Sequence, residues 1–172
     1  MLRFKDCKGL ELWSIGLDNG LPFNAKDGEV VGMQNSIFVP HGQFSIRIQG
    51  QVVISEIHGP WNLEMMSAWG KSIGPIAQAL SATGPVGSVG IYHHSLLTSP
   101  DSLVLLAKML RFSVAHYRVV CTADVYDASV EGYMLGKRIF KSVYEGSVPN
   151  QSFTALPEAI IWVNQCLDAE RT

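Results

Sequence analysis

The 172-residue sequence has few charged residues and lacks several motifs of familiar enzymes. Charged residues make up 16% of the chain, and the formal net charge at pH 7 is −2. No cluster of lysine and arginine occurs, which argues against nucleic acid as a partner. Neither a Gly-x-Gly-x-x-Gly run nor a P-loop is present. Gly87-Ser88-Val89-Gly90 only approaches a nucleophile elbow and stands at the front of an apolar strand. We therefore expect a protein that is not an enzyme.

Cysteine is scarce, and no apolar run is long enough for a membrane span. Cys7, Cys121 and Cys166 are widely spaced, so we expect reduced thiols, two of them filling the core. The longest uncharged run, 72–100, is broken by glycines, prolines and two histidines. The first residues lack a charged n-region followed by an apolar core and a small-residue cleavage site, so we expect no secretory signal. These observations predict a cytoplasmic protein without a membrane span, a metal or a cofactor.

The chain divides at about residue 40. Residues 1–42 contain six glycines and two prolines, and no apolar period continues for more than a few positions. We interpret residues 1–39 as a loosely ordered extension and residues 40–172 as the domain. The extension is either a linker or, in part, an artefact of a start codon assigned upstream of a true start at Met33.

Beyond residue 43, apolar residues follow the periods of strands and helices. Apolar and polar residues alternate over 44–49, which predicts a strand, and a second strand is expected over 52–58. Gly50-Gln51 between them suits a tight turn, so the two strands are expected to form a hairpin. A helix is expected over 63–80, capped by Asn62 and kinked or split at Gly74-Pro75. Further segments are expected as a strand over 86–92, a helix over 100–116, a strand over 118–125, a helix over 129–144, an extended piece over 152–156 and a helix over 157–167. This order predicts an α/β fold with a mixed sheet of about four to five strands and helices packed on it.

Polar residues that follow the two middle strands form the candidate site. In an α/β fold, ligands and partners bind where the carboxyl ends of parallel strands meet. A rim of seven residues would lie there: His93, His94, Ser95, Thr98, Ser99, Tyr126 and Asp127. We expect this rim to bind a partner or to be phosphorylated, and we assign no catalytic residue.

Some of these residues also have simpler structural interpretations. Thr98 or Ser99 can cap the following helix, whose N-terminus could instead bind an anion or a phosphoryl group. His93 and His94 are adjacent at a strand end, so they are expected to point to opposite faces and to shape the turn rather than chelate one metal. Trp61 is interpreted as a packing anchor or, alternatively, as a binding residue.

Three segments carry a resemblance to a known family. They are Gly-Pro-Trp-Asn-Leu-Glu at 59–64, the strand, turn and helix over 86–117, and Leu-Pro-Glu-Ala-Ile-Ile-Trp at 156–162. Together with the element order, they make residues 40–167 similar to the STAS domain, or SpoIIAA-like fold, of sulphate transporters and anti-sigma-factor antagonists. The chain particularly resembles the small stand-alone bacterial members, whose role is uncharacterised.

The resemblance implies a regulatory domain that binds a protein. In the antagonists, a phosphorylatable serine follows an acidic residue in an Asp-Ser-Ser-Gly pattern, but the matching turn here, 93–100, lacks both the acidic residue and the glycine. We therefore expect a non-enzymatic regulatory or protein-interaction domain, with a protein partner or a second copy of the chain.

Two other functions remain open at this point. The apolar helix around 103–112 and the methionines Met65, Met66, Met109 and Met134 would suit a carrier of a small apolar or lipid-like ligand. A hydrolase using Ser95 with His93 or His94 ranks last.

Overall fold

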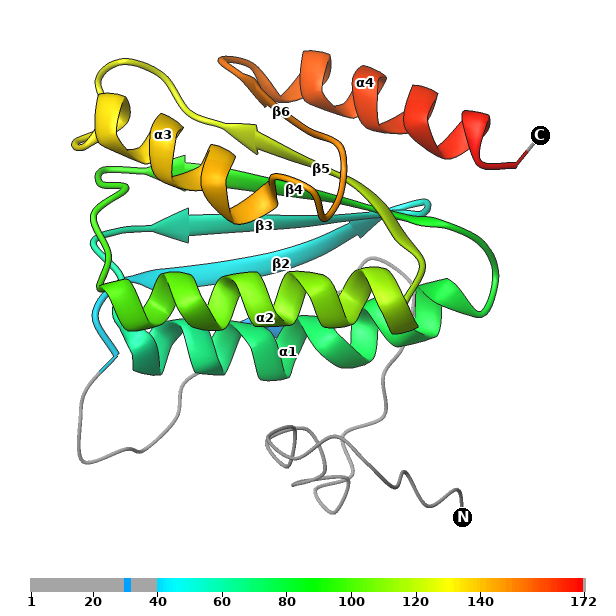
Figure 1. Cartoon of the computed structure of the whole chain (residues 1–172), viewed down its shortest axis with the longest axis horizontal. Coiled ribbons are helices and arrows are strands. Elements are labelled where there is room, and N and C mark those ends of the chain that lie inside the picture. The colour runs from blue at the N-terminus through cyan, green and yellow to red at the C-terminus, as the bar shows by residue number, and fades with distance from the viewer. Residues whose placement is uncertain (1–29, 32–39, 172) are drawn as a thin grey trace.

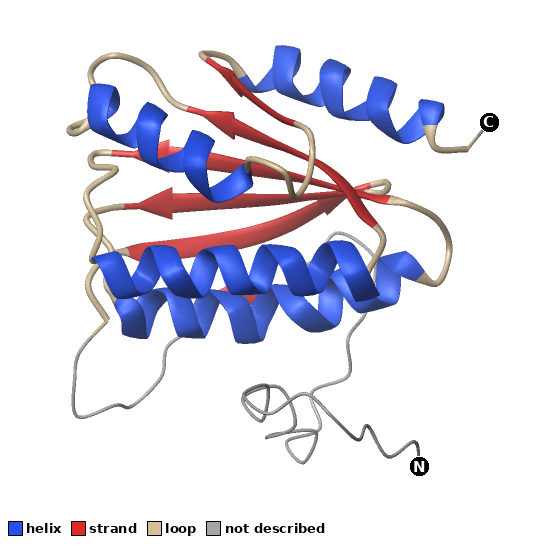
Figure 2. Cartoon of the chain, in the orientation of Figure 1, coloured by secondary structure: helices blue, strands red, loops and turns tan. Residues whose placement is uncertain are grey.

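The computed structural model describes residues 30–31 and 40–171, which form one mixed sheet with four helices (Figures 1 and 2). In chain order the elements are β1 (Val30–Val31), β2 (Gln43–Gln49), β3 (Val52–His58), α1 (Leu63–Ser81), β4 (Val86–His93), α2 (Pro100–His116), β5 (Val119–Val125), α3 (Tyr133–Tyr144), β6 (Asn150–Phe153) and α4 (Leu156–Ala169). The α/β class and the mixed sheet of the sequence prediction are confirmed.

The strands lie in the sheet in the same order as in the chain. β2 and β3 form the expected antiparallel hairpin around Gly50-Gln51, with Gln49 opposite Val52. From β3 onward every neighbouring pair is parallel, and a helix connects each strand to the next. The carboxyl ends of β3, β4, β5 and β6 therefore meet at one edge of the sheet.

Apolar side chains fill both faces of the sheet because successive residues of a strand point to opposite sides. In β3, Val53 and Ile57 belong to the larger core, which lies beneath α1, α2 and α3. Val52 and Ile54 belong to the second core, which α4 covers with Ala159, Val163 and Leu167. Figure 1 shows α1 and α2 side by side along the β2–β3 half of the sheet and α4 near β6. Beyond the reach of α4, the second face ends in partly exposed polar side chains.

Several boundaries differ from the sequence prediction. α1 continues through Pro75 and is not split there. Pro75 has no N–H to donate to the carbonyl of Lys71, but both residues are exposed, so water can bind that carbonyl. α3 begins four residues later than expected because Asp127 accepts a hydrogen bond from Ser129 N at 2.8 Å, which holds a turn there. β6 begins at Asn150, two residues before the expected extended segment.

The extension predicted over residues 1–39 lies outside the described residues, apart from β1. Val30 and Val31 pair antiparallel with Ile46 and Ser45 of β2, a strand that the sequence did not predict. Among the helices that the structure describes, none combines the length and the hydropathy of a membrane-spanning segment.

Candidate functional site

Three segments meet at the carboxyl edge of the sheet, and main-chain hydrogen bonds join them. Trp61 N donates to Leu97 O at 3.2 Å, which ties the start of α1 to the β4–α2 turn. Glu131 N donates to His94 O at 2.9 Å, and Leu96 N donates to Glu131 O at 2.8 Å, which tie the same turn to the segment before α3. We call this edge the strand-end rim and define it as residues 59–63, 93–99 and 126–135.

The structure brings the seven predicted residues to this edge, but it leaves only five of them at the surface. His94 and Asp127 are exposed, and His93, Thr98 and Ser99 are half-buried. Ser95 is 2% exposed and Tyr126 is 4% exposed. These two side chains therefore cannot contribute to a contact surface, which corrects that part of the prediction.

Internal contacts hold the buried side chains of Ser95 and Tyr126 and satisfy their hydroxyl groups. The Ser95 hydroxyl accepts a hydrogen bond from Leu97 N at 3.1 Å and so fixes the β4–α2 turn from inside. The Tyr126 ring packs edge-on against Tyr92, and its hydroxyl lies 3.1 Å from that of Ser152. Both residues hold the rim in shape.

Of the two remaining hydroxyls of the turn, that of Ser99 has a structural role. Ser99 caps α2, since its Oγ accepts from Ser102 N at 3.3 Å, which confirms the capping interpretation for this residue. Thr98 Oγ1 is buried and has no hydrogen-bond partner in the part of the chain that the structure describes. Trp61 is 2% exposed and its ring is stacked over Phe140, so it is a packing anchor.

Sequence reasoning missed the apolar side chains that the rim exposes. Leu63 is 37% exposed, Leu97 39%, Met134 68% and Leu135 54%. Leu97 lies centrally among them: its side chain packs over Gly132, just before α3, and its carbonyl bonds to the segment that leads into Leu63. Periodicity could not reveal this exposure, because Leu63, Met134 and Leu135 fit the apolar pattern of helices that are buried on one side, and Leu97 lies in a turn without any period.

A buried carboxyl group lies behind the rim, between the sheet and α3. Asp124 is 1% exposed, and its Oδ2 accepts a hydrogen bond from Asn150 Nδ2 at 2.9 Å while its Oδ1 accepts one from Tyr144 at 3.3 Å. Burial raises the pKa of Asp124 to about 6, and the hydrogen bonds from Asn150 and Tyr144 keep it from rising further. This group is part of a satisfied polar network inside the core.

Two small cavities adjoin that network. One, of about 30 Å³, is lined in part by Asp124, Tyr92 and Trp69. The other, of about 60 Å³, lies between the sheet and α1 and α2 and has a mainly apolar lining that includes Ile73, Leu106 and Met109. A water molecule needs roughly 10–15 Å³ of such space, so these cavities have room for a few waters.

One match to the Gly-x-Ser-x-Gly pattern occurs, at 70–74, but it lies inside α1. Ser72 Oγ donates to Ala68 O at 3.1 Å, as helical serines often do. A nucleophile elbow needs a sharp turn between a strand and a helix, so this match is not one.

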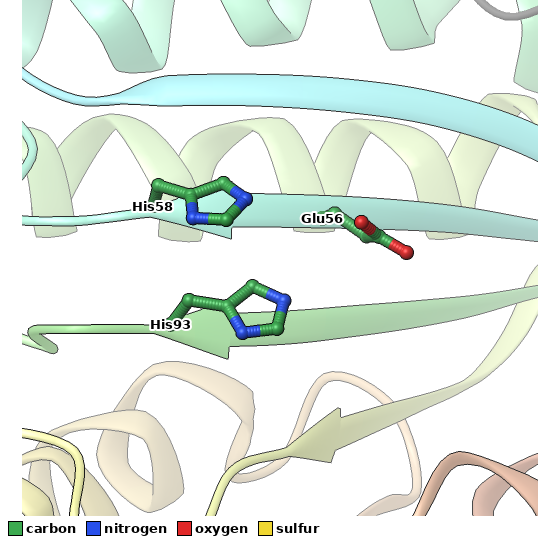
Figure 3. A group of neighbouring side chains, drawn as sticks. All are labelled: Glu56, His58 and His93. Atoms are coloured by element: carbon green, nitrogen blue, oxygen red, sulfur yellow. The ribbon is translucent and has the colours of Figure 1, made fainter.

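Three side chains that could hold a metal ion gather on the sheet face opposite to α1 and α2. Glu56 and His58 come from β3 and His93 comes from the end of β4 (Figure 3). One potential ligand atom from each residue can be chosen so that the three atoms lie within 4.8 Å of one another. Partial burial lowers the pKa of His58, the neighbouring His93 and His94 lower it further, and Glu56 opposes them.

The His94 ring also lies near this group, contrary to the expectation that His93 and His94 diverge. Its centroid is 5.3 Å from that of His58 and 6.4 Å from that of His93. The strand has ended at this point and His94 has φ +66°, so the alternation of side chains along a strand no longer applies.

Searches for related proteins matched no family model, no curated protein and no solved structure. The structure itself shows the α/β fold, whereas the resemblance to the STAS domain stays a prediction from the residues and the element order.

Proposed function

We propose that this chain is a non-enzymatic, cytoplasmic regulatory domain of STAS-like type that binds a protein through the strand-end rim. The observation that carries the proposal is the exposure of Leu63, Leu97, Met134 and Leu135 on segments that meet at this edge. Large exposed apolar side chains that gather on one surface are typical of protein interaction sites. Exposed His94 and Asp127 would supply a polar margin around them.

The rigidity of the rim supports the same proposal. The β4–α2 turn is held by the Ser99 cap, by Ser95 from within and by main-chain bonds to both neighbouring segments. A surface that is already ordered loses less conformational entropy when a partner binds. The rim would then bind a partner without the serine switch of the antagonists, whose sequence pattern is missing here.

The test compares charged substitutions inside and outside the rim. Leu97→Asp and Leu135→Asp should abolish retention of specific partners from native cells, whereas Ile161→Asp should not. Ile161 is the matched control because it is 60% exposed and lies on α4, away from the rim. Sedimentation of the purified chain identifies the case in which the partner is a second copy. Equal partner retention by all three variants would refute the proposal.

A carrier of a small apolar ligand is the second candidate, favoured by the mainly apolar cavity beneath α1 and α2. The cavity of about 60 Å³ would have to open for a lipid-like molecule, by separation of α1 and α2 from the sheet. Native mass spectrometry of the chain purified from its own cells tests this function. A bound apolar molecule at one per chain would support it, and an unliganded mass would count against it.

A further inference from the structure

The pairing of β3 with β4 places two histidines directly opposite each other. His58 and His93 are register partners at the ends of two neighbouring parallel strands. Glu56 lies two residues before His58, so its side chain is on the same face of the sheet. Two imidazoles and a carboxylate thus lie together although His93 stands 35 positions after His58 in the sequence (93 − 58).

The spacing of these groups suits one small cation. The His58 and His93 rings are stacked with centroids 4.5 Å apart and an interplanar angle of 18°. Figure 3 shows both rings side by side with the Glu56 carboxylate next to them. Nitrogen and oxygen ligands of a tetrahedral zinc ion stand about 2.0–2.2 Å from the metal, hence about 3.3 Å from one another. In the structure the candidate ligand atoms are up to 4.8 Å apart. The three side chains are only half-buried, so small rotations about their torsions can bring these atoms to the separation that one zinc ion needs.

We propose that Glu56, His58 and His93 form a binding site for a divalent transition-metal ion such as Zn²⁺. Two imidazole nitrogens and one carboxylate oxygen are a donor set that suits Zn²⁺, whereas Ca²⁺ and Mg²⁺ prefer oxygen alone. The site is partly open to solvent, so water can take a fourth position. The main chain that carries the ligands lies in paired strands, which holds the donors in place.

Two side chains, Arg47 and His94, lie next to this site. Arg47 Nε lies 4.0 Å from Glu56 Oε1 and competes with the metal for the carboxylate. This ion pair is exposed and therefore weak, so Arg47 can turn away when a cation binds. His94 is the nearest additional imidazole, but the structure does not place it within the ligand group.

Titration calorimetry with Zn²⁺ on the full chain, freed of metal by a chelator and kept in a thiol-free reductant, tests the site. We expect one Zn²⁺ per chain. Loss of an outer partner of a metal ligand typically costs 10- to 100-fold in affinity, so His58→Asn and His93→Asn should each lose at least about 10-fold. His116→Asn, at the far end of α2, is the matched control and should bind as the wild type does.

A gain-of-binding variant keeps the test independent of folding defects. Arg47→Gln should bind Zn²⁺ more tightly than the wild type, because the competing cation is gone while the hydrogen-bonding side chain remains. Co²⁺ bound in place of Zn²⁺ should show the visible absorption of a tetrahedral complex. Wild-type binding weaker than about 100 μM, or unchanged affinity in both His58→Asn and His93→Asn, would overturn the proposal. The rim includes His93, but each of these experiments measures the affinity for Zn²⁺ alone, so none of them tests partner binding by the rim.

Discussion

Replacement of Asp124 by asparagine should change how the stability of this domain depends on pH. Asp124 is fully enclosed between the sheet and α3, and asparagine has nearly the same shape. Its amide can still accept the hydrogen bond from Asn150 through the oxygen and donate to the Tyr144 hydroxyl through the nitrogen. The variant therefore removes the titrating group with little change in packing.

The magnitude follows from the pKa of Asp124, about 6 in the native state and 3.8 when it is not buried. Below pH 3.8 both states hold the proton; between 3.8 and 6 only the native state does, so native stability falls as pH rises through this window. At 1.36 kcal/mol per pKa unit the full loss is about 3 kcal/mol. Of this, about 2 kcal/mol falls between pH 4 and pH 7.

Urea unfolding of wild type and Asp124→Asn at several pH values, followed by tryptophan fluorescence, measures this difference. The free energy of unfolding of the variant, relative to wild type, should rise by about 2 kcal/mol from pH 4 to pH 7. Asp127→Asn is the control: hydrogen bonds from Ser129 lower the pKa of exposed Asp127, so its contribution to stability is lost only below about pH 3.8, and the difference from wild type should stay nearly constant between pH 4 and pH 7. A difference between Asp124→Asn and wild type that stays constant with pH would refute the reasoning.

Two further substitutions test the packing of the rim and of the second core. Thr98→Val should stabilise the domain by about 1 kcal/mol, since it removes a buried hydroxyl without a partner among the described residues; a lower melting temperature would contradict this. Gly87→Ala should cost about 1–3 kcal/mol, because the new methyl group would collide with Val163 of α4. Urea unfolding of Gly87→Ala combined with Val163→Ala should show a smaller loss than the sum of the single losses, and simple additivity would argue against the collision.

The sequence predicted the elements with strong periodicity and clear capping residues. The hairpin around Gly50-Gln51, the Asn62 and Ser99 caps and α2 all lie where expected. Local interactions decide these features, so the residues themselves suffice. The late start of α3 depends on the Asp127–Ser129 turn, which competes with helix formation and is invisible to a search for apolar periods.

The candidate site was predicted only in part, for reasons of register and burial. The sequence placed His93 at the end of a strand, but the pairing that brings His58 opposite it exists only once β3 and β4 are aligned. Likewise, Ser95 and Tyr126 follow strands as predicted, yet packing turns their side chains inward. Sequence position determines the edge at which a residue lies, whereas tertiary contacts determine whether its side chain is accessible.

Site-specific photocrosslinking in native cells tests the rim most directly. A photoreactive amino acid is placed at Leu97, at the centre of the rim, and in a separate chain at Ile161 on α4, which is also exposed. The proposed function predicts that position 97 is joined to a discrete protein, or to a second copy of the chain, and that position 161 is not. The same products from both positions, or none from position 97, would contradict it.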